Sequence, residues 1–351
     1  MSNTATVLAF DFGASSGRAI RAVYDGQNLT YEEIHRFENV PIEKGGHLFW
    51  DVETLLKEIH TAIQKAGTFD SLGFDTWGVD FGLLDADGHL LANPVHYRDA
   101  RTNGKPEQAA ARMPAEELYA HTGNQIMAIN TLFQLLALRE QEPELLQKAE
   151  QVLFMPDLFA ALLGAEPVCE RSIASTSQML DPRTGQWSRE VLTAYGLKEN
   201  HFAPLVASGT VTGTLTTGAK IIAVAGHDTQ CASAAMPCAE EDAEHTAFLS
   251  CGTWSLLGTE LEAPILTADS CQSGLSNELG ANGKINYLKN IIGLWLIQES
   301  RREYKRRGQA YSFAELEQQA LAAEPLRSFI DPDAPESVSY THLRAHETEA
   351  D

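Results

Sequence analysis

The hydrophobic pattern at the start of the chain predicts a hairpin with a glycine-rich turn. Residues 6–10 are apolar and β-branched, as in a buried strand. Residues 18–24 alternate before Asp25 and Gly26, which predicts the returning strand. Residues 13–17 are rich in glycine and small hydroxyls, and such a turn lets backbone N–H groups approach phosphate oxygens without an intervening Cβ. The alternative is an ordinary hairpin whose serines cap the turn.

The same pattern occurs a second time. Residues 246–258 again contain an apolar strand, a Gly/Thr/Ser turn and a returning strand. When Gly13 is placed on Gly252, Ser250 stands where Asp11 does, so only the first copy has a carboxylate that can hold Mg²⁺ beside a phosphate. Two such turns predict two related half-molecules that grip one polyphosphate from opposite sides. Since Gly/Thr/Ser turns are common, coincidence is the alternative.

Helices and strands are predicted to alternate between the two hairpins. The pattern indicates a third strand over 29–37, an amphipathic helix over 51–63 with Asp51 as N-cap, and a buried strand over 71–76. Further elements are expected as a helix over 130–139 capped by Asn130, a helix from Pro143, a strand over 220–226, a helix over 293–307 and a helix opened by a capping box at Ser312. This order indicates an α/β fold with mixed sheets flanked by helices.

Composition restricts the functions that are open to the chain. It has 351 residues, 44% hydrophobic and 21% charged, which suits a globular protein with enough length for two cores. A net charge of −22 opposes binding to nucleic acid or to an anionic membrane. We expect no secretory signal and no membrane-crossing run. Five cysteines without CxxC spacing indicate reduced thiols, so we expect a cytoplasmic protein.

Three groups of residues carry candidate chemistry. Asp228 follows an apolar strand, where a carboxylate can accept the proton that a hydroxyl releases during phosphoryl transfer. Trp77 can pack its face on a sugar, and Gly78 lets a substrate approach the backbone. Asn290 and Gln298 are polar groups on an otherwise apolar segment. The alternatives are a helix cap for Asp228 and Asn290, and core packing for Trp77.

Together these segments resemble the FGGY carbohydrate kinases. The resemblance is carried, in order along the chain, by residues 11–18, 75–81, 97–99, 101–102, 155–157, 227–229, 250–255 and 288–296. It implies two ribonuclease-H-like domains of the actin/hexokinase/Hsp70-like ATPase group that close on substrates in the cleft between them. It also implies ATP-dependent phosphorylation of the 1-hydroxyl of a ketose, with L-rhamnulose from L-rhamnose breakdown as the expected substrate. The alternatives are a kinase of L-fuculose or a pentulose, and a non-catalytic sugar or nucleotide sensor.

The resemblance also implies roles for individual residues. Asp228 is the expected base, and the presence of Asp11 and Asp228 together argues against a sensor, which needs no proton acceptor. The expected sugar contacts are Trp77, Gly78, His227, Asp228 and Thr229, with His227 as a hydrogen-bonded neighbour and not a second base. The expected ATP contacts are Ala14, Ser15, Ser16, Gly17 and Arg18 in the first turn and Thr253, Asn290 and Gln298 in the second half, with Asp11 on the Mg²⁺ side through water.

The domain boundaries follow from the same reading. We expect a first domain over residues 1–237 and a second over 238–336. The family continues through a glycine-rich adenosine-binding segment that this chain does not match. The expectation is therefore a C-terminally truncated, incomplete second domain, with weak ATP binding and little or no turnover. Residues 337–351 continue none of the earlier patterning and are expected to be a non-native tail. The sequence makes no prediction of oligomeric state.

Overall fold

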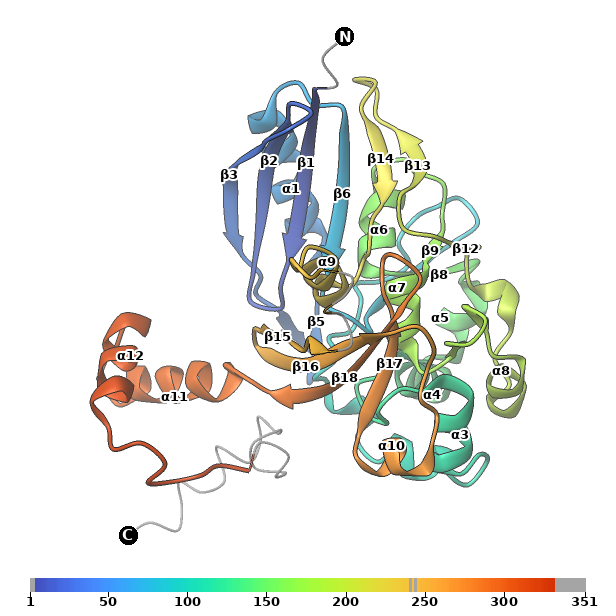
Figure 1. The fold of residues 1–351 in the computed structure, drawn as a ribbon. Coiled ribbons are helices and arrows are strands. Elements are labelled where there is room, and N and C mark those ends of the chain that lie inside the picture. Colours follow the sequence, from blue (N-terminus) through green and yellow to red (C-terminus); the bar gives the residue numbers. More distant parts are fainter. Residues whose placement is uncertain (1–3, 240–241, 243–244, 332–351) are drawn as a thin grey trace. The chain divides into compact units, whose positions relative to one another are not determined.

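The computed structural model describes residues 4–239, 242 and 245–331. Its largest sheet has the strand order β13-β14-β6-β1-β2-β3. Strand β1 pairs antiparallel with β2 and parallel with β6, and β6 pairs parallel with β14. The six strands span β1 Ala5–Phe12, β2 Ser16–Tyr24, β3 Leu29–Glu38, β6 Ser71–Thr76, β13 Thr210–Thr214 and β14 Lys220–Ala223. Figure 1 shows them in blue and yellow.

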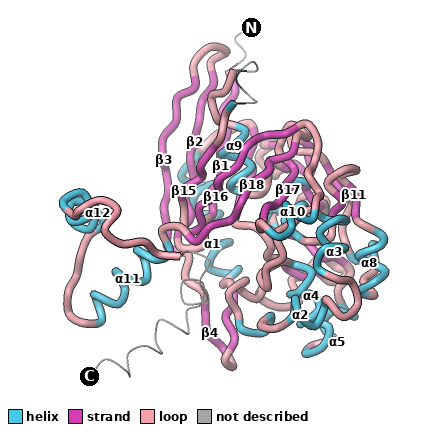
Figure 2. Tube along the Cα trace, turned by 60° about the horizontal axis from the view of Figure 1, so that its bottom comes forward, coloured by secondary structure: helices cyan, strands magenta, loops and turns pink. Residues whose placement is uncertain are grey.

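The rest of the first unit consists mainly of helices and short two-stranded ribbons. The helices span α1 Val52–Ala66, α2 Lys105–Ala109, α3 Ala115–Thr122, α4 Thr131–Gln141, α5 Pro143–Lys148, α6 Met155–Leu162, α7 Arg171–Ala174, α8 Arg189–Tyr195, α9 Asp228–Ala234 and α10 Ala268–Gln272, with 3-10 turns η1 Ala100–Thr102, η2 Ser175–Ser177 and η3 Glu199–His201. The ribbons pair β4 Ile42–Lys44 with β5 His47–Phe49, β7 Phe81–Leu84 with β8 Gln151–Phe154, β12 Leu205–Val206 with β9 Cys169–Glu170, and β10 Leu180–Asp181 with β11 Gln186–Trp187. Figure 2 shows α2, α3, α4, α5 and α8 gathered to one side of β1, β2 and β3.

Alternation along β1 separates a core face of the sheet from an open face. Phe10 and Phe12 are fully buried, whereas Ala9 is exposed and Asp11 is half-buried. The ring of Phe159 on α6 lies 5.1 Å from that of Phe12, so α6 covers the phenylalanine face. Because successive side chains of a strand point to opposite faces, Asp11 lies on the side away from this aromatic core.

Contacts divide the chain into two compact units. The first holds residues up to 246 together with 259–288, and the second holds 247–258 together with the chain from residue 289 onward. In the second unit β15 pairs antiparallel with β16, with Ser250 opposite Leu256. The second unit contains β15 Phe248–Cys251, α11 Trp295–Arg306 and α12 Phe313–Ala322. Strand β17 Leu275–Leu279 belongs to the first unit, and the residues of β16 Trp254–Leu261 and β18 Ile285–Ile292 are divided between the two units.

The local predictions are confirmed where capping chemistry or strict alternation supports them. The third strand, the helix after Asp51, the buried strand over 71–76 and the second hairpin are all present. The Asp51 carboxylate accepts a hydrogen bond from the Thr54 backbone N–H at 3.1 Å, as its role as N-cap requires. Ser312 and Glu315 form the predicted capping box.

The structure contradicts one predicted helix cap and one alternative. Asn130 stands at the N-cap position of α4, but its side-chain amide donates to the Gln125 carbonyl and to Gln178 and makes no capping bond. Asn290 lies in strand β18, so it is not a helix cap, and the helix expected from residue 293 begins at Trp295.

The expected domain limits remain predictions. The boundary between residues 237 and 238 precedes a stretch that is only partly described, and residues 259–288 pack with the first unit. The expected tail over 337–351 lies outside the described residues. Within the described part of the chain, each helix falls short of the length and apolarity that crossing a membrane requires.

Replacing Phe10 with Ala tests the aromatic core beneath the sheet. The Phe10 ring is fully buried and stacks on Phe74 with 4.8 Å between centroids, so the change should lower the free energy of unfolding by about 3–5 kcal/mol. Urea unfolding measures this. The matched change Tyr31→Ala removes a ring that is 74% exposed and should shift the free energy by less than about 0.5 kcal/mol. Equal effects of the two changes would contradict this description of the core.

Candidate functional site

Three neighbouring strands deliver acidic residues to one edge of the main sheet. Asp11 and Asp75 are register partners on the parallel strands β1 and β6. The chain leaving β14 continues this edge, because the Thr76 backbone N–H donates to the Gly226 carbonyl at 2.8 Å and Thr76 bridges to His227. Parallel strands end at the same edge of a sheet, which brings Asp228 to the same place as the two strand carboxylates.

These carboxylates affect one another electrostatically. Burial, followed by the nearby charges of Asp11 and Asp228, raises the pKa of Asp75 well above its usual value. Burial also raises the pKa of Asp228, while His227 opposes the rise. Ionising all of these acid groups together is therefore electrostatically unfavourable. Such clusters are typical of sites that bind cations or transfer protons.

The first turn has the backbone features expected of a phosphate site. The Gly13 N–H donates to the Ser16 carbonyl at 2.9 Å, and the Asn39 side chain donates to the Gly13 carbonyl at 3.0 Å, so the turn is held from within. The N–H groups of Ala14 and Ser15 make no hydrogen bond to any described residue. Both groups are available to an anion.

Arg18 and Gly17 contact residues outside this turn. The Arg18 guanidinium bonds to Asp11 Oδ2, with its Nε at 2.8 Å. Gly17 lies in β2, and a Cβ added there would come within 2.2 Å of the Phe37 ring. Packing against the Phe37 ring therefore requires glycine at position 17. The sequence had indicated Gly17 only because it lies beside the turn.

Asp228 is accessible at the first residue of α9. Its side chain is 38% exposed, and its Oδ1 accepts from the Thr229 backbone N–H at 2.6 Å and from the Thr229 hydroxyl at 3.3 Å. No described donor bonds to Oδ2. The helix-cap alternative for Asp228 is wrong, because His227 stands at the N-cap of α9 and Asp228 is the first helical residue. Its bonds to Thr229 use one carboxylate oxygen and leave the other available. Thr229 itself is buried and supports Asp228.

His227 lies between two carboxylates. Its Nδ1 is 2.9 Å from Glu278 Oε2 on β17, and its Nε2 is 3.4 Å from Asp228 Oδ1. Burial lowers the pKa of His227, but the charge and hydrogen bond of Glu278 and the charge of Asp228 outweigh this and raise it to about 9. The imidazole is therefore a cation at neutral pH. A Cβ added to Gly78 would lie 3.3 Å from its Nε2, so Gly78 borders the same spot.

Trp77 is a core residue. It is only 6% exposed, and its ring packs on Trp50 with 4.0 Å between centroids. Its indole N–H donates to Asp80 at 3.0 Å. These contacts favour the core alternative over the predicted stacking of a sugar on Trp77, because the indole face is already covered.

Asp80 holds the loop that carries Gly78. This fully buried carboxylate accepts from the Trp50 indole at 2.6 Å, from the Trp77 indole and the Tyr97 backbone N–H, and from the Gln134 side chain at 2.8 Å. Burial raises the pKa of Asp80 to about 6, although these donors oppose the rise. Four converging donors fix the loop in one geometry.

Val79 stores backbone strain next to Gly78. Its φ is 67°, a left-handed value that a β-branched residue rarely adopts. The Thr131 hydroxyl donates to the Val79 carbonyl at 2.6 Å, and the Val79 N–H donates to the Thr176 hydroxyl at 3.1 Å. Strain of this kind costs about 1–3 kcal/mol and is typical of functional loops.

Glu170 fixes the segment that leads to Asp228. One of its carboxylate oxygens accepts from the N–H groups of Gly226 at 3.0 Å, Ser172 at 2.9 Å and Ile173 at 3.2 Å, and the other accepts from the Ser208 hydroxyl. The residue is 1% exposed. Removing this carboxylate would leave buried donors unpaired, so Glu170 is a structural anchor for the strand end.

The second unit brings its predicted residues into one short region. The Thr253 carbonyl accepts from the Gly293 N–H at 3.3 Å and from the Trp295 N–H at 3.2 Å, which joins the second turn to the start of α11. A Cβ on Gly293 would lie 2.4 Å from Ser255 Oγ, so only glycine permits this approach. Asn290 precedes the junction, and Gln298 follows it with a buried side-chain oxygen that has no partner among the described residues.

Four residues of the site were absent from the predicted set: Asp75, Asp80, Glu170 and Glu278. A signal existed for Asp75, since it ends an apolar strand as Asp11 does. Asp80 lay inside a segment that the sequence had singled out. Glu170 caps α7 locally, but its bond to Gly226 joins residues 56 apart, and Glu278 bonds to His227 across 51 residues, so neither long-range role had a sequence signal.

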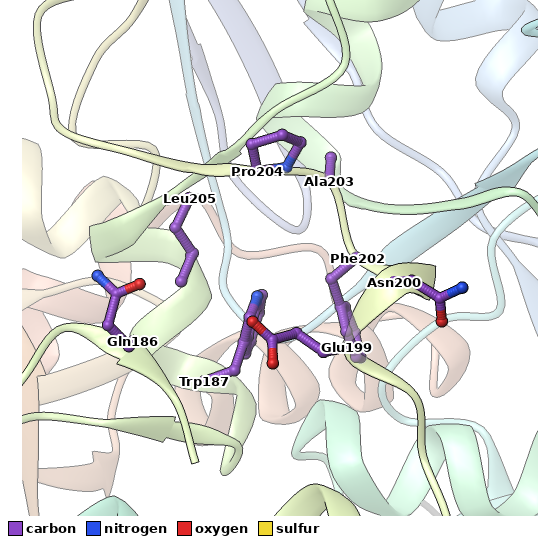
Figure 3. Close-up of a pocket in the computed structure, with 8 residues that line it drawn as sticks. All are labelled: Gln186, Trp187, Glu199, Asn200, Phe202, Ala203, Pro204 and Leu205. Carbon is purple, nitrogen blue, oxygen red and sulfur yellow. The ribbon is translucent and has the colours of Figure 1, made fainter. Parts of the chain in front are cut away.

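A pocket of about 420 Å³ lies elsewhere in the first unit. It is lined by Gln186, Trp187, Glu199, Asn200, Phe202, Ala203, Pro204 and Leu205 (Figure 3). None of the predicted site residues belongs to this lining. Trp187 is 7% exposed and packs its ring on Phe202, so it offers no free face to a ligand.

Comparison with known proteins decides the family. Residues 6–234 match the N-terminal domain of the FGGY family of carbohydrate kinases, and residues 247–346 match its C-terminal domain. The chain belongs to the FGGY family of carbohydrate kinases. It is therefore built on the actin/hexokinase-like fold, with mixed sheets flanked by helices, and ATP is the phosphoryl donor of the family.

Curated relatives and a solved structure agree with this family. The chain is 42% identical over 339 residues to a rhamnulokinase of Bacteroides thetaiotaomicron, a match that covers 93% of this chain and 68% of that protein. It is 39% identical to a rhamnulokinase of Enterococcus faecalis, covering 94% and 68%. A ligand-bound xylulose kinase from Lactobacillus acidophilus superposes with a TM-score of 0.72 at 15% identity, covering 91% and 66%, and this likeness concerns the fold. The FGGY kinase chain spans about two thirds of the length of these relatives.

Replacing Asp80 with Asn tests whether this carboxylate holds the Gly78 loop. The amide –NH2 would face N–H donors in place of an acceptor, so the free energy of unfolding should fall by about 2–4 kcal/mol. Chemical denaturation measures this. Asp87→Asn makes the same chemical change on an exposed loop and should be nearly neutral. If Asp80→Asn left the free energy of unfolding unchanged, the hydrogen bonds from the four donors would not depend on the negative charge of Asp80.

Proposed function

We propose that this protein is a rhamnulokinase, which transfers the γ-phosphoryl group of ATP to the 1-hydroxyl of L-rhamnulose. The observation that carries the proposal is the half-exposed Asp228 carboxylate, with one oxygen unbonded among the described residues, at the same sheet edge as the first phosphate turn. The 42% and 39% identity to proteins named rhamnulokinase supports L-rhamnulose as the ketose.

Asp228 is the proposed proton acceptor. As the bond from the sugar O1 to the γ-phosphorus forms and the bond from that phosphorus to the leaving ADP oxygen breaks, the hydroxyl proton passes to Asp228 Oδ2. Oδ1 keeps its bonds to Thr229 throughout, so the carboxylate is already oriented. Phosphoryl transfer has a loose transition state, and a positioned carboxylate is a sufficient base.

The sugar is proposed to bind beside Gly78 and His227. The His227 Nε2 lies next to the space that a side chain at Gly78 would fill. A charged imidazole there donates a hydrogen bond to a sugar oxygen and keeps a cation close to Asp228. Thr229 acts through Asp228, and Trp77 acts by holding Asp80 and the loop.

The nucleotide is proposed to use the backbone of the first turn and residues of the second unit. The unbonded N–H groups of Ala14 and Ser15 fit phosphate oxygens, and Ser16, Gly17 and Arg18 complete this segment. The remaining proposed contacts are Thr253, Asn290 and Gln298. The unpartnered buried oxygen of Gln298 fits a donor such as the amino group of a nucleotide base or a ribose hydroxyl.

Mg²⁺ is the proposed metal, held on the Asp11 side. Both bonds from Arg18 go to Asp11 Oδ2, and no described residue bonds to Oδ1, so a hard carboxylate oxygen is available to the ion or its waters. Bound Mg²⁺ would neutralise phosphate charge during transfer. Asp75, which is close enough for its pKa to respond to Asp11, is a second acidic group at this position.

The domain assignment is part of the same proposal. We take residues 1–237 as the domain with the sugar site, the first turn and the base, and residues 238–336 as the domain with the second turn. The two family matches, 6–234 and 247–346, lie on either side of that proposed boundary.

L-rhamnulose and competing ketoses distinguish the candidate substrates. Purified protein at a concentration equal to that of the sugar should convert L-rhamnulose and MgATP to a sugar 1-phosphate, detected by ³¹P NMR, and L-rhamnulose should bind more tightly than L-fuculose or a pentulose by calorimetry. High protein concentration makes slow transfer visible. A preference for another ketose would show that the proposed substrate is wrong. Binding of no ketose at all would overturn the kinase proposal.

Replacing Asp228 with Asn separates the base from a structural role. The amide cannot accept the proton, so transfer should fall by at least about a hundredfold. The isosteric side chain keeps the Thr229 bonds through its carbonyl, so sugar affinity should change little. Unchanged transfer in the variant would exclude Asp228 as the base.

A further inference from the structure

Glu278 reaches the proposed sugar site from a strand that the first unit holds firmly. On one side of it, the Asn277 N–H donates to the Gly123 carbonyl at 2.8 Å. On the other side, the Leu279 N–H donates to the Ser175 hydroxyl at 2.9 Å. Bonds at both neighbours leave the Glu278 backbone little freedom, so its side chain is delivered to one place.

The Glu278 carboxylate is buried and paired. The residue is 4% exposed, and its Oε2 receives His227 Nδ1 at 2.9 Å and the Gln230 side-chain amide at 2.7 Å. Gln230 is in turn bonded to Asn286. A buried carboxylate without a cation would be costly, so the pair favours a protonated His227.

The Nε2 side of the His227 imidazole faces Asp228 and Gly78. His227 Nε2 is 3.4 Å from Asp228 Oδ1 and lies 3.3 Å from the point where a Cβ on Gly78 would stand. A proton fixed on Nδ1 by Glu278, together with a second one on Nε2, gives a cation whose free N–H points at the sugar site. This arrangement has the geometry of a carboxylate that orients a histidine.

We propose that Glu278 is a positioning residue for phosphoryl transfer: it holds the His227 imidazole charged and oriented, so that Nε2–H faces the bound sugar and Asp228. This inference deepens the proposed function and rests on it. Glu278 itself does not touch the reacting atoms in this proposal, because His227 stands between.

The charge of Glu278 affects the pH at which His227 loses its proton. The charged and titratable groups that face His227 are Glu278 on β17, Asp228 on α9 and Asp75 on β6. Burial raises the pKa of Asp228, and the positive charge of His227 opposes this rise. Loss of the Glu278 charge would make His227 lose its proton at lower pH, so the cation beside Asp228 would disappear at a less alkaline pH.

The direct test is the titration of His227 in the sugar-free protein, which requires no turnover. The His227 ring signal is assigned by its disappearance in His227→Gln and followed by NMR against pH. It should titrate near pH 9 in the unmodified protein, and in Glu278→Gln the midpoint should fall by at least about one pH unit. Glu260→Gln, a matched change at a surface pair with Lys284, should leave the midpoint in place. An unmoved midpoint in Glu278→Gln would overturn the proposal.

Glu278→Asp keeps the charge and supplies a second variant if the amide disturbs folding. It should retain a midpoint between those of the unmodified protein and Glu278→Gln, whereas a midpoint as low as that of the amide would contradict a charge effect. Where transfer is measured, Glu278→Gln should move the alkaline limit of the pH profile of kcat/KM to lower pH, which a purely structural role would not do. A failure of L-rhamnulose binding by the unmodified protein would instead overturn the proposed function and leave the His227 titration interpretable.

Discussion

The candidate site depends on the parallel pairing of β1 and β6 and on the extension of the same edge by the chain after β14. Parallel strands end together, so Asp11, Asp75 and Asp228 must share one edge of the sheet. Burial and then the charges of Asp11 and Asp228 raise the pKa of Asp75, so gathering these groups is unfavourable by itself. The fold holds them there because Phe10 and Phe12 bury the opposite face of the same strands. The acid edge is thus maintained by the packing energy of the aromatic core.

Buried carboxylates position the loops of this site. Glu170 accepts a hydrogen bond from the Gly226 N–H, and Asp80 accepts hydrogen bonds from the indoles of Trp50 and Trp77 next to the Gly78 loop. Each converts a flexible segment into a fixed one, because displacement would leave buried donors without acceptors. The left-handed conformation of Val79 persists under the same constraint. The residues proposed to bind the sugar are therefore held in place in the absence of substrate, which would lower the entropic cost of aligning it.

Sequence patterns predict the fold well where the determining interactions are local. Both glycine-rich hairpins, the helix capped by Asp51 and the position of Asp228 at a strand end follow from spacing and capping chemistry. Sequence patterns miss contacts that depend on a distant partner. No pattern predicts that the Trp50 ring packs on Trp77, or that the Phe37 ring lies against Gly17. No periodicity links Glu278 to His227, because their pairing depends on how β17 is anchored.

The most direct measurement is a crystal structure of the protein with L-rhamnulose bound. The account predicts that the O1 hydroxyl lies about 3 Å from a carboxylate oxygen of Asp228, with another sugar oxygen facing His227 Nε2 beside Gly78. A sugar bound with O1 directed away from Asp228, or bound only in the pocket beside Trp187, would contradict it.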